Sequence, residues 1–275
     1  MMNRMGCINM QTIGFIGTGN LASSVIKGLS QQDTDFRIMA YDVFQEKAEL
    51  LAQTYGVASA SFAETIQGSD VIFLAVKPKD IKGLLDQLAQ FNLTGKLIIT
   101  VVAGIGLSVY EQALPGIAVI RVMPNTSSAV LQAVSGLARG RCVTDGQAKT
   151  AEAIFAVLGK FLWIDDSKMN ALTAVSGSGP AYFYFLTELM ALAGEKLGLT
   201  RDEAEFLAAE TMVGAGKMLA ESGKTSLELR EAVTSPNGTT YAALESFRQD
   251  GLADIVYQAM EACAKRAEEM EGEYV

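Results

Sequence analysis

The feature that most constrains this fold is a glycine turn placed between a strand pattern and a helix pattern. The apolar run 12–16 leads directly into Gly17-Thr18-Gly19-Asn20-Leu21-Ala22, and apolar residues then recur at helical spacing. The first glycine permits a tight turn, the second lets the backbone approach a pyrophosphate, and the alanine lets the helix pack closely on the sheet. The N-terminus of that helix offers free N–H groups to phosphates. The pattern predicts a dinucleotide-binding βαβ unit.

Strand and helix patterns alternate through the first half of the chain, which predicts right-handed βαβ units and a parallel sheet. The strand candidates are residues 12–16, 37–41, 71–76, 97–102 and 118–123, with weaker candidates at 134–138 and 161–164 that extend the same sheet. After about Ala171 the pattern becomes helical. We therefore expect an α/β fold, with a Rossmann-type parallel-sheet domain over residues 11–170 and an all-helical dimerisation domain over residues 171–275.

In the second half, apolar residues recur at three- and four-residue spacing through 182–197 and 203–219. Thr200 followed by Glu203 is a capping-box signature for the second of these helices, and Gly198 fits the end of the first. A few helices in about 100 residues form a thin core. Dimerisation through this domain is the expected remedy, and a self-sufficient four-helix bundle is the alternative.

Composition excludes several classes of function. The formal charge of −9 repels nucleic acid, so no nucleic-acid partner is expected. The chain has no histidine, and its three cysteines are widely spaced without a Cys-x-x-Cys pair, so no metal site is expected. The first ten residues lack the apolar region of a secretory signal, and the most apolar window, 97–107, is too short to span a membrane. We expect a cytoplasmic protein without membrane contact.

Three further residues fit a cofactor site. Asp42 ends the second expected strand, where an acidic residue accepts hydrogen bonds from an adenine-ribose 2′-hydroxyl and disfavours a 2′-phosphate. Alternatively Asp42 caps the helix that follows, and Lys47 supplies compensating charge. Lys77 and Pro78 leave the third strand at the ligand edge of an open sheet, although proline can also simply start a helix beside a solvated lysine.

Three further segments carry a resemblance: RVMPNT at 121–126, SGSGPAY at 176–182 and VTSPNGTT at 233–240. Together with Ala75-Val76-Lys77-Pro78 they resemble pyrroline-5-carboxylate reductases, and the resemblance covers residues 12 to about 268. It implies a Rossmann domain, a helical domain, and a homodimer interlocked through the helices and often assembled into rings of dimers. It also implies reduction of 1-pyrroline-5-carboxylate to L-proline by hydride transfer from NADPH or NADH, the last step of proline biosynthesis.

The resemblance assigns residues to two groups. The substrate loop contains Ser235, Gly238, Thr239 and Thr240. The cofactor contacts are Gly17, Thr18, Gly19, Asn20, Leu21, Ala22, Ala75, Val76, Lys77 and Pro78, with Val102 and Ala103 on the nicotinamide side. Asn237 stands where the family commonly has glycine, and asparagine is the residue next best able to adopt positive φ. Asp42 also departs from relatives that place small polar or basic residues at this turn, so the choice between NADH and NADPH stays open.

The substrate loop can be explained physically as a turn that feeds a helix, whose unpaired N–H groups bind a small carboxylate without arginine. Its serine and threonines could instead only cap that helix. In the functional interpretation, the catalytic residue is Thr240, with its hydroxyl near the imine nitrogen. A protonated imine is already electrophilic, so proximity and orientation suffice without histidine. The segment 176–182 either approaches the nicotinamide across the dimer or serves mainly as an interdomain joint.

Two other functions share this domain plan. A β-hydroxyacid or ketopantoate-type dehydrogenase needs a catalytic lysine on its first interdomain helix, but no lysine stands between Met169 and Lys196, and Lys168 lies just ahead. A redox sensor would bind NAD(H) without turning it over, because a fold does not fix a function. The intact substrate loop and the acidic composition favour the reductase.

Overall fold

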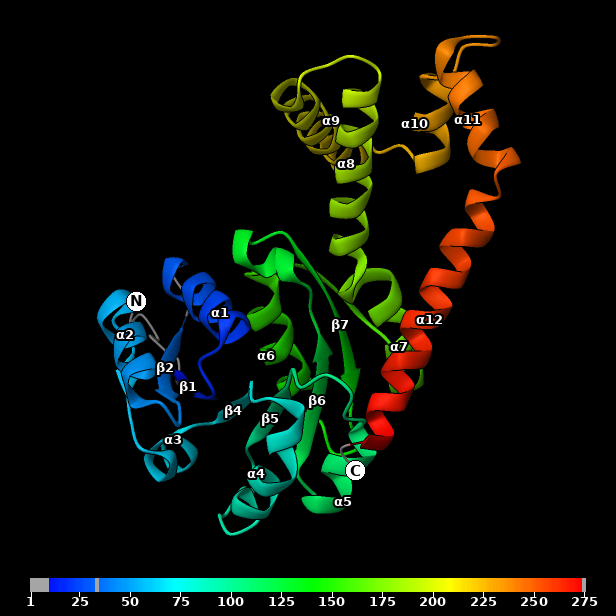
Figure 1. Cartoon of the computed structure of the whole chain (residues 1–275). Coiled ribbons are helices and arrows are strands. Elements are labelled where there is room, and N and C mark those ends of the chain that lie inside the picture. Colours follow the sequence, from blue (N-terminus) through cyan, green and yellow to red (C-terminus); the bar gives the residue numbers. More distant parts are fainter. Residues whose placement is uncertain (1–9, 33–34, 274–275) are drawn as a thin grey trace, which may run out of the picture. The chain divides into compact units, whose positions relative to one another are not determined.

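The computed structural model describes residues 10–32 and 35–273, which form two compact units (Figure 1). The first unit comprises the chain up to Gly177 together with Cys263 onward, and the second comprises Ser178–Ala262. The domain boundary expected at residue 171 stays a prediction. The first ten residues, which include Cys7 and for which no secretory signal was predicted, lie almost wholly outside the described residues.

Within the described residues, the first unit contains an eight-stranded sheet in the order β3-β2-β1-β4-β5-β6-β7-β8. All neighbouring strands are parallel except β6 and β7. The strands are β1 (Gln11–Ile16), β2 (Phe36–Tyr41), β3 (Ala58–Ser59), β4 (Val71–Leu74), β5 (Leu97–Thr100), β6 (Ala118–Met123), β7 (Ala133–Arg139) and β8 (Gly159–Trp163).

The predicted α/β class is confirmed, with three differences in the sheet. β7 runs antiparallel to β6, because the nine residues between them are too few for the helical crossover that a parallel neighbour requires. β3 was not predicted, since its two residues are both exposed. β4 and β5 end two residues earlier than predicted, so the segments after Leu74 and Thr100 leave the sheet.

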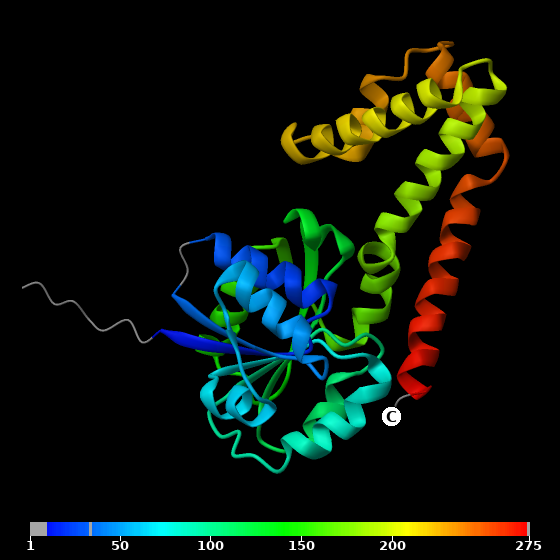
Figure 2. The ribbon, with the colours of Figure 1, turned by 60° about the vertical axis from the view of Figure 1, so that its left-hand side comes forward.

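Helices cover both faces of the sheet (Figures 1 and 2). Ile13 and Phe15 of β1 pack with one face, against α1 (Asn20–Gln31) and α6 (Asp145–Ala156). The alternate residue Ile16 packs on the other face, with α4 (Ile81–Leu88) and α5 (Leu107–Ala113). Strands buried on both faces explain why the central runs are continuously apolar. The other short helices of this unit are α2 (Gln45–Tyr55), α3 (Phe62–Gly68), η1 (Pro78–Asp80), η2 (Thr126–Val130), η3 (Asp166–Lys168), α7 (Met169–Leu172) and the π-helix η4 (Thr173–Gly177).

The second unit is helical, as predicted. It contains α8 (Gly179–Lys196), α9 (Arg201–Glu221), α10 (Ser226–Ala232), α11 (Thr239–Gln249) and the first half of α12 (Leu252–Glu273). The capping box of Thr200 and Glu203 starts α9, and Gly198 follows α8 with a φ of +105°. A second capping box, Thr225 with Glu228, starts α10, which was not predicted. None of the described helices is long and apolar enough to cross a membrane.

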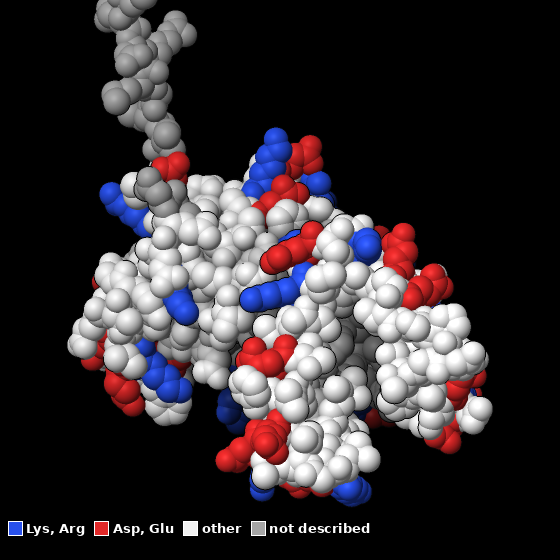
Figure 3. Space-filling view, turned by 90° about the horizontal axis from the view of Figure 1, so that it is seen from above, with Lys and Arg blue, Asp and Glu red and all other residues white. Residues whose placement is uncertain are grey.

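The core of the second unit is small. The buried apolar side chains that the structure describes there belong to Ala191, Ala204 and Ala208. Large apolar side chains are exposed along its helices, among them Phe183, Phe185 and Leu189 of α8, Phe206 and Leu207 of α9, and Ile255 and Tyr257 of α12. A core of three alanines does not fit a self-sufficient bundle, and an exposed apolar surface of this kind marks an interaction site. On the face shown in Figure 3, acidic and basic side chains are interspersed among the residues described.

The junction between α6 and β8 generates a stability prediction. Gly159 has a φ of +141°, and a Cβ atom there would lie 2.3 Å from the carbonyl oxygen of Ala133. We expect Gly159→Ala to lower the free energy of unfolding by more than about 1 kcal/mol, because both the backbone and the space forbid a side chain. Urea denaturation measures this. Gly146→Ala in α6, where the added Cβ meets only Thr144 Oγ1 at 4.0 Å, is the matched control and should not destabilise.

Candidate functional site

A cleft of about 740 Å³ opens at the carboxyl ends of β1, β2 and β4, in the first unit. This is the edge at which open parallel sheets bind ligands. Six predicted cofactor residues line it: Gly17, Gly19, Asp42, Ala75, Val76 and Lys77. Val43, Phe44, Lys47 and Lys79 line it as well, and of these only Lys47 was singled out from the sequence.

The turn after β1 has the geometry that the sequence predicted. Gly17 has a φ of +91°, and its N–H donates to the carbonyl oxygen of Tyr41 at 2.8 Å. A Cβ atom at Gly17 would lie 2.6 Å from the carbonyl oxygen of Ala75. Glycine is therefore required here both for its backbone conformation and for the close approach of the segment after β4.

Gly19 plays a different role, at the start of α1. A Cβ atom there would meet nothing within 4 Å, so the space beside its backbone is open. Gly19 is the N-cap residue, no side chain caps the helix, and its first turn carries no acidic residue. The first N–H groups of α1 are thus available to an anion. Open space and uncapped donors at one point fit the pyrophosphate of a dinucleotide.

The remaining predicted residues of this motif lie in the turn itself or at the start of α1. Ala22 is fully buried and packs into the core shared by α1 and the sheet, as predicted. Thr18 is also buried, and it faces Asp42. Asn20 and Leu21 lie in the first turn of α1.

Asp42 anchors the glycine turn. Its Oδ2 accepts hydrogen bonds from the backbone N–H and the hydroxyl of Thr18, each at 2.8 Å, and its Oδ1 accepts from the N–H of Phe44 at 3.0 Å. Burial raises the pKa of this carboxyl, but these hydrogen bonds and the charge of Lys47 outweigh burial and hold its pKa below the ordinary value. Asp42 is not the N-cap of α2, since that residue is Phe44.

Lysines surround the same cleft. Lys77 is the N-cap residue of η1 and Pro78 is its first residue, so proline does start a helical turn as the simpler interpretation expected. Lys77 lines the cleft nevertheless, together with Lys79. Lys47 lies over the ring of Phe44, 4.9 Å from its centroid. The cleft is therefore lined by two carboxylates, of Asp42 and Asp80, and by three lysines.

The segment after β5 contains Val102, which is buried, and Ala103, which is half-buried. Neither residue lines the cleft described above. The backbone N–H of Val102 donates to Thr100 Oγ1 at 3.3 Å, and Thr100 Oγ1 lies 2.7 Å from the hydroxyl of Tyr110. Burial raises the pKa of Tyr110, so its hydroxyl stays protonated. This polar support beneath the segment was not predicted.

The segment 176–182 divides into two parts. Up to Gly177 it belongs to the first unit, where the side-chain amide of Asn125 donates to the carbonyl oxygen of Ser176 at 3.3 Å. From Ser178 it belongs to the second unit, and Pro180 lies in the first turn of α8. The boundary between the units falls inside this motif and directly follows a π-helix, which fits the joint interpretation.

The expected substrate loop lies in the second unit, directly ahead of α11. The N–H of Gly238 donates to the carbonyl oxygen of Ser235 at 3.0 Å, and Asn237 has a φ of +59°, as predicted for this position. Gly238 is the N-cap residue of α11 and no side chain caps the helix. Thr239 and Thr240 are its first two residues, and both are exposed. Self-capping by the loop is therefore not observed, and the first N–H groups of α11 remain available.

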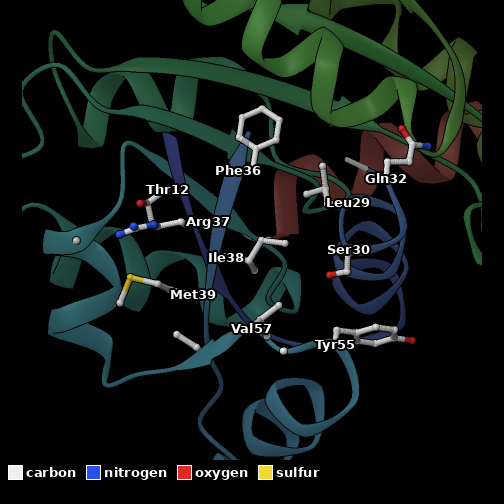
Figure 4. A pocket seen from close by; sticks show the side chains of 13 residues that line it. Thr12, Leu29, Ser30, Gln32, Phe36, Arg37, Ile38, Met39, Tyr55 and Val57 are labelled. Carbon is white, nitrogen blue, oxygen red and sulfur yellow. The ribbon is translucent and has the colours of Figure 1, made fainter. Parts of the chain in front are cut away.

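Another pocket lies toward the amino ends of the strands (Figure 4). Thr12 and Phe36, near the starts of β1 and β2, line it together with Tyr55 and Val57. No glycine turn or uncapped helix start of the cofactor motif belongs to this pocket. It is separate from the cleft at the carboxyl ends of the strands.

Comparisons with known proteins agree with this geometry. Residues 166–270 match the family model described as pyrroline-5-carboxylate reductase dimerisation, and residues 12–104 match the model described as NADP oxidoreductase, coenzyme F420-dependent. The pyrroline-5-carboxylate reductase of Pseudomonas aeruginosa is 40% identical over 94% of this chain and 96% of its own. This chain belongs to the pyrroline-5-carboxylate reductase family.

Other members of the pyrroline-5-carboxylate reductase family support the same assignment. The enzyme of Methanosarcina acetivorans is 37% identical over 94% of this chain and 98% of its own. The solved structure from Coxiella burnetii has a TM-score of 0.89, with 31% identity over 95% of this chain and 99% of that chain. The structure from Plasmodium falciparum, with NADP bound, has a TM-score of 0.82, with 25% identity over 97% of this chain and 100% of that chain.

Family membership also bears on the rival dehydrogenase interpretation. The nearest candidate for its catalytic lysine, Lys168, has a side chain that is 65% exposed and pairs with Asp165 at 3.3 Å. An exposed lysine of this kind has an ordinary solvated environment. Lys168 therefore lacks the environment expected of a lysine that acts as catalytic acid and base.

The two glycines of the turn generate a paired prediction. We expect Gly19→Ala to lower the melting temperature only slightly, as the loss of a glycine N-cap does, but to weaken NAD(P)H binding at least about tenfold, because its Cβ occupies only the open space that a pyrophosphate approaches. We expect Gly17→Ala to lower the melting temperature, because its Cβ meets the Ala75 carbonyl. Thermal denaturation and fluorescence titration with NADH separate the two effects. Equal losses of stability in both variants would contradict this division of roles.

Proposed function

We propose that this chain reduces 1-pyrroline-5-carboxylate to L-proline with NAD(P)H, the last step of proline biosynthesis, in the cytoplasm. The observation that carries the proposal is that both sequence motifs, the glycine turn and the substrate loop, lead into a helix start without a side-chain cap. One follows the glycine turn at Gly19, and the other follows the substrate loop at Gly238. The first suits a pyrophosphate and the second a small carboxylate. Family membership supports the pairing of these two sites with imine reduction.

The substrate loop binds the carboxylate of the imino acid. Backbone N–H groups at the start of α11 supply hydrogen bonds and a positive dipole end, and the hydroxyls of Ser235 and Thr239 add further donors. Both threonines are exposed, so the loop is accessible to a ligand. An anion site built from backbone groups agrees with a chain whose acidic residues outnumber its basic ones.

NAD(P)H supplies a hydride to the imine carbon, and a proton completes the secondary amine of proline. We assign the cofactor contacts to Gly17, Gly19, Asp42, Ala75, Val76 and Lys77 in the cleft, to Thr18, Asn20, Leu21, Ala22 and Pro78 beside it, and to Val102 and Ala103 on the nicotinamide side. The Thr240 hydroxyl orients the imine nitrogen. Because the protonated imine is electrophilic, this alignment replaces a strong acid catalyst.

We further propose a homodimer formed through the second unit, assembled into a ring of dimers, without membrane contact. The match of residues 166–270 to the dimerisation model supports the homodimer. So does the contrast between its three-alanine core and its exposed aromatic and aliphatic side chains. Burying one such large side chain contributes roughly 1.5–3 kcal/mol. A partner subunit therefore supplies the core that the single chain lacks.

Oxidation of NADH and NADPH by the purified protein tests the reaction. Absorbance is followed with and without pyrroline-5-carboxylate, and proline is measured in the same samples. Imine-dependent oxidation that yields one proline per cofactor establishes the activity. Cofactor binding without imine-dependent turnover would indicate a sensor instead, and would overturn the proposal.

Thr240 can be tested separately from the rest of its loop. We expect Thr240→Ala to lower kcat about 10²-fold, because the imine loses its orientation, while the Kd for NADPH stays within about twofold. Thr240→Ser keeps the hydroxyl and should retain most activity. Steady-state kinetics and cofactor titration give the two values. A matching loss of cofactor affinity in Thr240→Ala would show that this residue has another role.

Asp42 should influence cofactor preference. We expect Asp42→Asn to raise the ratio of kcat/KM for NADPH over NADH by about tenfold, because it removes the negative charge that repels a 2′-phosphate and leaves lysines in the cleft. Asparagine is nearly isosteric, so it disturbs Thr18 less than a small side chain would. Steady-state kinetics with both cofactors measures the ratio. An unchanged ratio would place the selectivity at the lysines.

A further inference from the structure

A buried arginine with two carboxylate partners lies beneath the segment after β5. Arg121, in β6, is only 6% exposed. Its Nη1 donates to Oδ1 of Asp166 at 2.9 Å, and its Nη2 donates to Oε1 of Glu271 at 2.9 Å. Glu271 belongs to the last turns of α12, which are part of the first unit. The three residues thus join β6, η3 and the C-terminal turns of the chain.

Asp166 and the end of α12 each reach the segment 101–107. The second oxygen of Asp166 accepts a hydrogen bond from the N–H of Leu107 at 2.9 Å, which fixes the end of this loop where α5 begins. Gly104, inside the loop, has a φ of +71°, and a Cβ atom there would lie 3.1 Å from Cβ of Met270. Met270 precedes Glu271 in the chain. The loop is therefore fastened by Asp166 at one point and covered by the end of α12 at another.

The sheet register places the arginine directly beside the start of the same loop. Arg121 pairs with Thr100, whose hydroxyl accepts from the N–H of Val102 and contacts Tyr110. The loop is thus supported at its start by Thr100 and at its end by Asp166. Val102 and Ala103, the residues assigned to the nicotinamide side, lie between these two supports.

We propose that Arg121 is a positioning residue. Through its ion pair with Glu271 it holds the end of α12 against the loop 101–106, and this contact keeps the loop in the conformation that receives the nicotinamide ring. This inference rests on the proposed role of Val102 and Ala103. A buried guanidinium with two carboxylate partners is costly to desolvate and adds little stability over an apolar replacement, whereas it fixes geometry strongly. Its value to the enzyme is then the placement of the loop.

The test uses Glu271 because its side chain is 31% exposed and its removal leaves the arginine paired with Asp166. Glu271→Ala removes the contact. Glu271→Gln keeps an oxygen that can accept from Arg121, and serves as the conservative rescue. Glu268→Ala changes the charge by the same amount at an exposed position on the same helix, and is the matched control.

Two readouts separate positioning from general stability. We expect hydrogen–deuterium exchange in residues 101–107 to rise in Glu271→Ala but not in Glu271→Gln or Glu268→Ala. We expect the affinity for NADH to fall about threefold to tenfold in Glu271→Ala. The affinity for ADP-ribose, which lacks the nicotinamide, should stay unchanged.

Unchanged exchange in residues 101–107 of Glu271→Ala would overturn the proposal, and so would an equal loss of ADP-ribose affinity. The exchange readout requires neither imine nor turnover. It therefore remains decisive for the loop even if the purified protein fails to reduce pyrroline-5-carboxylate, which would count against the proposed function alone.

Discussion

The close approach between the turn after β1 and the segment after β4 determines where the cleft at the carboxyl ends of the strands opens. The carbonyl of Ala75 lies so near Gly17 that no side chain fits between them. Both segments therefore leave the sheet at the same point, and the chain opens a cleft there. Asp42 then holds the turn from the next strand through Thr18. The cleft follows from this packing, because the sheet is buried on both faces and open only at its strand ends.

The second unit obeys the opposite constraint, because it has long helices but almost no interior. Three alanines cannot offset the conformational entropy of helices this long, whereas the exposed aromatic and aliphatic side chains can once a second surface covers them. Small residues between α8 and α9 let the helices pack tightly, as Gly194 beside Ala204 shows. The unit is thus organised for association, and its fold and its assembly depend on the same side chains.

How well the sequence predicted the structure depended on whether the cause was local. β6 was predicted with its observed bounds, because an apolar run buried on both faces leaves a clear signal. The positive φ of Asn237 followed from one residue, and the capping box of α9 followed from two residues three positions apart. The antiparallel direction of β7 depends on a connection too short for a crossover, and the two exposed residues of β3 carry no apolar signal. The glycine turn was predicted as a site, but the hydrogen bonds of Asp42 to Thr18 were not, because 24 residues separate them.

The partners of Arg121 show this limit most clearly, since 150 residues separate it from Glu271. The motif that contains Arg121 carried a family resemblance without a physical role. The contacts of Arg121 in the structure point to a physical role, and that role agrees with the chemistry of hydride transfer. An enzyme without histidine gains its rate from the alignment of a hydride donor with an electrophilic carbon, and small displacements reduce such a rate strongly. If the loop 101–106 receives the nicotinamide as proposed, rigid support under it is as important to the reaction as any group that touches the substrate. The proposal thereby gives the costly buried guanidinium a role that an apolar side chain could not fill.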